Sequence, residues 1–190
     1  MKALIIYSHP NHKGHNGYIL KQVESNLKKS NVDYEVLDLY KLNFNPVLSD
    51  DELYTHRGSI KSEETLSYQK LIKKYQNLIF IYPTWWNAMP AILKGFIDKV
   101  FTAGFAFKYV GKFPKPLLKG RAVVFTTTGA PSLLYRIFQR GVSIKLISKY
   151  TLGFCGIKTK GYSLGSATTL DDKQKVRIEN LVNNALRFLK

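Results

Sequence analysis

Apolar residues gather into five short runs along the chain, and each run predicts a β-strand. The first, third and fourth runs are nearly continuous, which is typical of parallel strands buried on both faces. The second and fifth are weaker because polar residues interrupt them. Pro83 ends the third run, while Gly120 and Gly129 bound the fourth. The five predicted strands are residues 2–7, 34–39, 78–82, 121–127 and 156–162.

The segments between these runs repeat apolar residues every three or four positions, so they predict helices with one buried face. The clearest helix begins at Pro90, which suits a first helical turn because no bond needs its missing N–H there. In the second helix, Leu66, Leu71 and Ile72 are expected to face inward, and Gly141 is expected to break or kink the fourth. The predicted helices are residues 17–27, 63–76, 90–101, 133–150 and 171–189.

Two longer connections show neither the apolar runs of strands nor the three- or four-residue repeat of helices. Residues 40–59 contain the acidic cluster Asp50, Asp51 and Glu52, and we expect mostly loop there, with a short helical turn. Residues 104–119 are aromatic and broken by proline and glycine, so we expect them to run extended over the surface. We find no repeat, linker or low-complexity tract, and residues 1–190 are expected to form one domain.

Alternation of strands and helices predicts an α/β fold with a doubly wound sheet of five parallel strands. The strand order 2-1-3-4-5 would place the loops after the first, third and fourth strands at one edge of the sheet. Ligands bind at this edge in open parallel sheets, so the loops are the candidate site. The three loops are residues 8–16, 83–89 and 127–132.

The charge of the chain is large and basic. It holds 29 Lys and Arg residues against 13 Asp and Glu residues, for a formal net charge of +16. Such a charge can attract nucleic acid or an anionic membrane surface. The lysines are scattered, however, and no basic helix is interleaved with base-stacking aromatics. We therefore expect a solvated surface that attracts phosphate-bearing cofactors, and no nucleic-acid partner; membrane association stays open.

Cysteine content and hydropathy bear on the compartment. The single cysteine, Cys155, excludes an internal disulfide and a cysteine-based metal cage, which favours a reducing cytoplasm. No apolar run reaches the length of a membrane span, and the apolar start of the chain reads as a strand, not as an export signal.

The first candidate loop suits a phosphate because it precedes a helix, whose free N–H groups and dipole attract anions. Lys13 adds charge, Gly14 lets the backbone come close, and His15 and Asn16 can donate hydrogen bonds. The loop has neither the Gly-Lys-Ser/Thr ending of a Walker loop nor a GxGxxG motif. An ordinary polar turn stays an alternative on residue type alone. No metal site is expected, because the three histidines of the loop lack a carboxylate or cysteine at the usual spacing.

The second and third loops suit a flat ring. Trp85 and Trp86 can stack on one, although a tryptophan pair is also typical of a core or a dimer interface. The run from Thr126 to Ala130 can be an ordinary strand end. Alternatively, its N–H groups can point at the carbonyl edge of a bound ring, because Gly129 leaves room for the ring to come close.

Together the loops resemble the NAD(P)H:quinone oxidoreductase family, which includes DT-diaphorase and bacterial quinone reductases with a flavodoxin-like fold. The pattern P-A-x-L-K-G-x-x-D-x-V-F, which begins at Pro90, is specific, whereas the match in the first loop is looser. The resemblance covers nearly the whole chain. It is carried by His9, residues 13–16, 83–95, 98–101, 104–107 and 127–129, and residues 154–156 near the fifth strand.

This resemblance implies an enzyme with a non-covalent flavin, NAD(P)H as co-substrate and a quinone or similar planar acceptor. Backbone groups of Asn87 and Gly129, with the Tyr135 side chain, would act on the flavin ring. Trp86 and, across a homodimer, Phe107 and Tyr109 would line the substrate pocket. The cofactor-binding residues implied by the resemblance are His9, Lys13, Gly14, His15, Asn16, Pro83, Thr84, Trp85, Trp86, Asn87, Thr127, Thr128, Gly129, Ala130 and Tyr135.

The chain departs from the family pattern at three points. Gly14 replaces a common Ser or Thr, and Ala130 replaces the second of two glycines. No histidine follows Tyr135 in the region where some members have one, and Arg140 there is our hypothesis for stabilising a reduced flavin anion. FMN is favoured over FAD because the extra C-terminal segment of the larger FAD-binding members is not seen. An ancillary subunit of a potassium-efflux antiporter stays an alternative function. The basic charge and the long aromatic loops argue against a third function, that of an electron-carrier flavodoxin.

Overall fold

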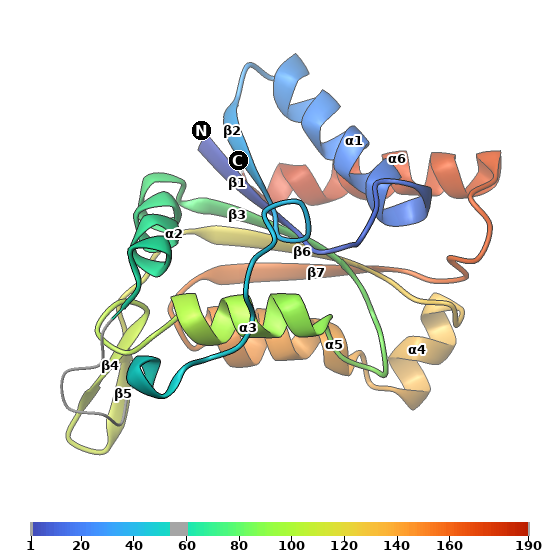
Figure 1. Ribbon diagram of the computed structural model, residues 1–190. Coiled ribbons are helices and arrows are strands. Elements are labelled where there is room, and N and C mark those ends of the chain that lie inside the picture. Colours follow the sequence, from blue (N-terminus) through green and yellow to red (C-terminus); the bar gives the residue numbers. More distant parts are fainter. Residues whose placement is uncertain (1, 54–60, 190) are drawn as a thin grey trace.

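The computed structural model describes residues 2–53 and 61–189 of the chain. Its centre is a parallel sheet in the order β2-β1-β3-β6-β7, which is the predicted order 2-1-3-4-5 counted over these five strands. Figure 1 shows helices on both sides of this sheet. The strands are β1 (Lys2–Tyr7), β2 (Asp33–Asp38), β3 (Asn77–Pro83), β6 (Arg121–Thr127) and β7 (Lys158–Leu164).

The register of the sheet sets neighbouring strand ends level. Ile5 of β1 lies between Val36 of β2 and Ile79 of β3, and Ile79 in turn pairs with Val123 of β6. Since all five strands run in parallel, their carboxyl ends share one edge of the sheet. That edge is where the three candidate loops begin.

Two helical layers cover the sheet because alternate residues of each strand point to opposite faces. On β1, Ala3, Ile5 and Tyr7 join the core beneath α1 and α6, whereas Leu4 and Ile6 join the core beneath α2, α3 and η2. The helices are α1 (Gly14–Lys29), α2 (Glu63–Lys74), α3 (Ala91–Val100), α4 (Ser132–Phe138), α5 (Val142–Lys145) and α6 (Asp172–Leu186), with the π-helix η2 (Leu146–Gly153) and the 3-10 turns η1 (Asp50–Glu52) and η3 (Arg187–Leu189).

The short turn expected at the acidic cluster is present as η1. Ser49 and Glu52 form a capping box, and the Glu52 carboxylate lies 3.3 Å from the Lys99 ammonium of α3. Both side chains of this ion pair are nearly buried, at 12% and 8% exposure. The pair therefore fixes η1 against α3. The remainder of the predicted 40–59 loop includes residues 54–60, which lie outside the described part of the chain.

Several predicted elements differ from the structure in extent. Helix α1 begins at Gly14, three residues earlier than predicted, and β7 ends two residues later. The predicted fourth helix divides at Gly141, which has a φ of +59°, so the expected break is confirmed. Leu66 is 41% exposed, contrary to prediction, because the face of α2 that packs inward carries Tyr68 and Ile72.

Residues 104–119 hold a small hairpin where an extended segment was predicted. Strand β4 (Phe107–Val110) pairs antiparallel with β5 (Phe113–Pro116) in a separate two-stranded sheet. In Figure 1 this hairpin stands at the opposite side of the molecule from α4. The segment is therefore extended and largely at the surface, as expected, but it is also paired.

Candidate functional site

The three predicted loops meet at the carboxyl edge of the sheet. The Thr84 N–H donates to the Thr127 carbonyl at 2.8 Å, and the Asn16 amide donates to the Thr127 hydroxyl at 2.9 Å. A third link joins the Thr84 and Thr126 hydroxyls at 2.7 Å. Because these bonds connect residues up to 111 positions apart, tertiary structure holds the loops together.

The first loop ends in the amino-terminal turn of α1. Lys13 is the N-cap, with an extended backbone, and its side chain makes no capping bond to any described residue. Gly14 follows with a φ of +75°, and a Cβ there would meet nothing within 4 Å. Residues 14–16 thus belong to the helix, not to the turn before it as predicted. Their N–H groups stand where a helix dipole favours an anion.

His15 and Asn16 carry polar atoms that the described part of the chain leaves without a partner. The Nε2 atom of His15 and the Oδ1 atom of Asn16 are buried and make no hydrogen bond within residues 2–53 and 61–189. Burial lowers the pKa of His15, against smaller opposing effects of the Thr169 backbone and Asp171. His15 is therefore set as a neutral imidazole with one nitrogen free to meet a ligand.

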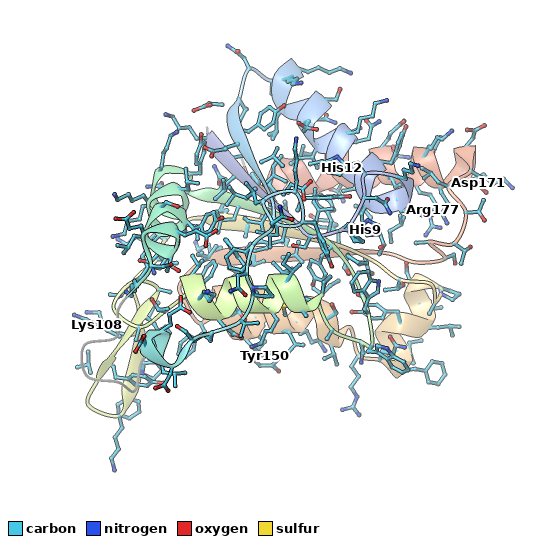
Figure 2. The ribbon with its side chains drawn as sticks, in the orientation of Figure 1. His9, His12, Lys108, Tyr150, Asp171 and Arg177 are labelled. Carbon is cyan, nitrogen blue, oxygen red and sulfur yellow. The ribbon has the colours of Figure 1, made fainter. Side chains whose placement is uncertain are left out.

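His12, which sequence analysis left without a role, pairs with the Asp38 carboxylate at the end of β2. Asp38 also accepts the N–H of Lys41, and burial followed by the Asp38 charge raises the pKa of the Tyr7 hydroxyl beside it. Figure 2 shows His9 and His12 near the start of α1. The pair spans 26 residues, so only the adjacency of β1 and β2 could have suggested it.

Two adjoining cavities lie between the loops. One has a volume of about 290 Å³ and the other about 320 Å³, and both have Thr84, Thr128 and Gly129 in their walls. The first cavity is also lined by His9, Lys13, Gly14, His15, Asn16, Pro83, Trp85, Thr127 and Ala167. The second is also lined by Trp86, Asn87, Ala130 and Gln139. We call the two cavities together the cradle.

The tip of the second loop is a tight turn. Trp85 and Ala88 exchange backbone hydrogen bonds at 3.0 and 2.9 Å, and the two residues between them have positive φ, 49° for Trp86 and 60° for Asn87. Such backbone is unfavourable for a tryptophan, and strain of this kind is often found at functional sites. The turn leaves the Trp86 side chain wholly exposed at the rim of the cradle. Beneath it, Oδ1 of Asn87 is buried without a partner among the described residues.

Tyr135 lies apart from the cradle. Its side chain is fully buried, and it lines a third cavity of about 280 Å³ together with Arg140 and Gly141. Its hydroxyl is unpartnered within the part of the chain that the structure describes. Tyr135 and Arg140 thus line the same cavity, and neither is in the walls of the two cradle cavities.

Phe107 and Tyr109 are on the β4–β5 hairpin, away from the cradle of their own chain (Figure 1). The Phe107 ring lies 5.1 Å from that of Phe154 and 5.8 Å from that of Tyr109. Phe107 lines a fourth cavity, of about 360 Å³, beside η2 and α3. Neither Phe107 nor Tyr109 lines either cavity of the cradle.

Two residues of the cradle, Gln139 and Ala167, were not among the predicted site residues. Ala167 lies in the loop after β7, and its N–H donates to the Thr128 carbonyl at 3.0 Å. The one signal for Ala167 in the sequence was the predicted place of the fifth strand at the edge of the sheet, because the loop after it also starts at the carboxyl edge. In residues 2–53 and 61–189, no three His, Cys, Asp or Glu side chains gather as metal ligands would.

Comparison with known proteins agrees with the geometry. The sequence model of a family described as having a flavodoxin-like fold matches residues 1–187. A Haemophilus influenzae protein named as an uncharacterized NAD(P)H oxidoreductase is 33% identical, over 94% of this chain and 91% of its own. The ribosyldihydronicotinamide dehydrogenase [quinone] of Mus musculus is 30% identical, over 93% of this chain and 87% of its own.

A solved structure adds a further relative. The NAD(P)H:quinone oxidoreductase from Methanothermobacter marburgensis superimposes with a TM-score of 0.85 at 28% identity, over 100% of this chain and 99% of its own. These relatives extend over nearly the full length of the chain, so the likeness includes all three loops of the cradle.

Proposed function

The chain belongs to the family with the flavodoxin-like fold, and from that premise we propose that it is a flavin-dependent NAD(P)H:quinone oxidoreductase. One observation carries the proposal. Buried polar atoms of His15, Asn16 and Asn87, without partners among the described residues, line one cradle that Gly129 leaves open. Buried polar groups are normally satisfied, so these three suit a polar ligand.

The amino-terminal end of α1 would hold the phosphate of the flavin. The N–H groups of Gly14, His15 and Asn16 lie at the positive end of the helix, and Lys13 adds a cation. The open space above Gly14 lets an anion approach the backbone. Gly14 supplies no hydroxyl, but the free Nε2 atom of His15 can contribute a polar contact in its place.

The second and third loops would hold the ring. Residues 83–87 and 127–130 line the two cavities of the cradle, and their backbone N–H groups are the available donors to the edge of a flavin. The flavin supplies the redox chemistry, accepting two electrons as hydride from NAD(P)H and giving them to the acceptor. The protein orients the ring, excludes water from it and offers Trp86 as a stacking surface. The nicotinamide and the quinone would use this surface in turn, which predicts ping-pong kinetics.

We favour FMN over FAD. The two cavities of the cradle, at about 290 and 320 Å³, are together of a size that suits a mononucleotide better than a dinucleotide. A reducing cytoplasm is the proposed compartment because the one cysteine, Cys155, is buried and unpaired. The antiporter-subunit alternative has no support from the cradle or from the relatives named above.

We propose a homodimer in which the partner completes the substrate pocket. Helix α4 exposes an apolar surface next to the cradle, with Leu133 67%, Ile137 59% and Phe138 77% exposed. Burial of this surface against a second copy would be favourable. It would also allow Phe107 and Tyr109 of one copy to reach the cradle of the other.

The visible spectrum of purified, FMN-loaded protein tests the proposal. Without oxygen, NADH or NADPH should bleach the flavin absorption, and a soluble quinone should restore it. Lys21→Gln, an exposed change on α1 away from the cradle, should behave as the parent does. A colourless protein that takes up neither FMN nor FAD, or a flavin that NAD(P)H does not bleach, would overturn the proposal.

A further inference from the structure

The acidic residues of the chain avoid one long segment. Between Asp98 and Asp171 the sequence has no Asp or Glu, although it has twelve Lys and Arg residues there. This acid-free segment includes the β4–β5 hairpin, α4, α5 and η2. Among the residues that the structure describes, eleven of the eighteen large apolar side chains that are exposed belong to it as well. Cationic and apolar surface thus occur together in one part of the chain.

The hairpin concentrates this combination at its turn. The register pairs Val110 with Phe113 next to the turn and Lys108 with Lys115 one pair further back on the same face. Phe113 is 79% exposed and Val110 57%. Lys112, in the turn itself, is also exposed. We call the face formed by Lys108, Val110, Phe113 and Lys115 the hairpin tip face.

The Lys108–Lys115 pair is unfavourable in the isolated protein. Like charges directly opposite on an antiparallel pair destabilise it. Within the described residues, neither lysine is in an ion pair, and the chain offers no acidic neighbour in sequence. Figure 2 labels Lys108 at the outer side of the molecule. An anionic partner would relieve the repulsion.

The opposite face of the hairpin has a different neighbourhood. Side chains alternate along a strand, so Phe107 and Tyr109 point away from the tip face. Phe107 packs on Phe154 of the body of the protein. The proposed dimer uses Phe107 and Tyr109 and leaves the tip face uncommitted. The tip face of a second copy is also a poor occupant, because the lysines of the two tip faces would repel each other.

We propose that the hairpin tip face docks on an anionic phospholipid bilayer. Val110 and Phe113 would enter the interface between headgroups and acyl chains, while Lys108 and Lys115 would reach the phosphates. The Val110–Phe113 pair and the Lys108–Lys115 pair are two residues apart along each strand, or about 7 Å. This distance fits the roughly 5–10 Å depth to which proteins insert at a membrane interface. The described part of the chain has no helix that could span a bilayer. The contact would thus be peripheral, and it does not depend on the proposed flavin site.

Sedimentation with lipid vesicles tests this directly. We expect binding to phosphatidylcholine vesicles containing phosphatidylglycerol, and little binding to phosphatidylcholine alone or at high salt. Lys108→Gln/Lys115→Gln should weaken binding roughly 25-fold, since each lysine at an anionic surface contributes about fivefold. The matched control Lys21→Gln/Lys28→Gln removes the same charge from exposed positions on α1, and it should weaken binding less than threefold.

A second variant reports insertion without relying on charge. Phe113→Trp should show quenching of its added fluorescence by brominated acyl chains, beyond that of the parent with Trp85 and Trp86. The idea fails if both lysine pairs lower affinity equally, which would indicate bulk charge alone, or if anionic vesicles do not bind. It also fails if the hairpin variants change the oligomeric state but not vesicle binding, or if duplex nucleic acid competes with the vesicles for the tip face.

Discussion

The cradle and the β4–β5 hairpin are two regions built in opposite ways. Bonds between distant segments hold the cradle, such as that from Asn16 to Thr127, and its buried polar atoms lack partners among the described residues. The hairpin is held by bonds between residues at most nine positions apart, and its polar groups face water. The cradle should therefore depend on the whole sheet, whereas the hairpin should accept substitutions at little cost in stability.

The largest effect is expected at Gly17, which fastens the first loop to α1. A Cβ there would lie 1.8 Å from the His12 carbonyl oxygen. Gly17→Ala should lower the free energy of unfolding by about 3 kcal/mol, because the backbone must shift. The same shift should weaken flavin binding. Urea titration measures the loss, and Gly129→Ala, whose Cβ meets nothing within 4 Å, is the control. Equal stability of the two variants would contradict the account.

Flavin affinity should be most sensitive at Gly129, in the wall shared by both cavities. Gly129→Val fills open space, so stability should stay within about 0.5 kcal/mol of the parent. Overlap with the ring should weaken flavin binding roughly ten- to hundredfold, as expected for 1–3 kcal/mol of crowding. Fluorescence titration of the apoprotein measures this. Unchanged affinity would place the ring elsewhere.

A gain in stability is expected at Trp86, whose φ of 49° suits asparagine better than tryptophan. Trp86→Asn should raise the free energy of unfolding by about 1 kcal/mol, while the KM for a planar quinone should rise because the stacking surface is lost. Trp85→Asn is the matched control, since Trp85 has no positive φ and should gain nothing. A Trp86 variant that is less stable than the parent would show that the turn is not strained.

A smaller effect is expected at His15, whose pKa burial lowers in the folded protein. The unfolded chain, with a pKa near 6.5, takes up a proton first as the pH falls. The contribution of neutral His15 to the free energy of unfolding is therefore complete above about pH 6.5. It declines as the pH falls toward the lower pKa that His15 has in the folded protein. Thermal unfolding of the apoprotein from pH 8 to pH 5 should show a shallower decline for His15→Gln. Identical pH profiles would rule out this contribution.

The smallest effect should come from the hairpin. Val110→Ser and Phe113→Ser alter exposed side chains, so stability and flavin affinity should change by less than about 0.5 kcal/mol. The measurements are the urea and flavin titrations used for the cradle variants. A large loss of stability would show that the tip face packs against the protein.

The sheet could be predicted from sequence because its signals are local. The apolar runs at β1, β3 and β6 are nearly continuous, Pro83 ends the second of them and glycines bound the third, and their predicted bounds agree with the structure to within one residue. The start of α1 was missed because Gly14 and Asn16 are poor helix formers and only the helix dipole and tertiary bonds place them there. The hairpin was missed because its prolines are tolerated in a short, isolated pair of strands.

The site was predictable in outline and not in detail. Topology alone indicated that the first, third and fourth loops would meet, and the cavities confirm that they do, with Trp86 and Gly129 in one wall. The positions of Tyr135 and His12 depend on side-chain packing between distant elements, which leaves no periodic trace in sequence. Roles of individual residues toward the flavin stay predictions.

The most direct test of the account is titration of apoprotein with FMN and, in parallel, with riboflavin, which has the same ring but no phosphate. We expect FMN to bind at one per chain and at least a hundredfold more tightly than riboflavin, because the start of α1 and Lys13 would hold the phosphate. Equal affinities for the two compounds, or no binding of either, would contradict the claim that the loops at the carboxyl edge form a flavin cradle.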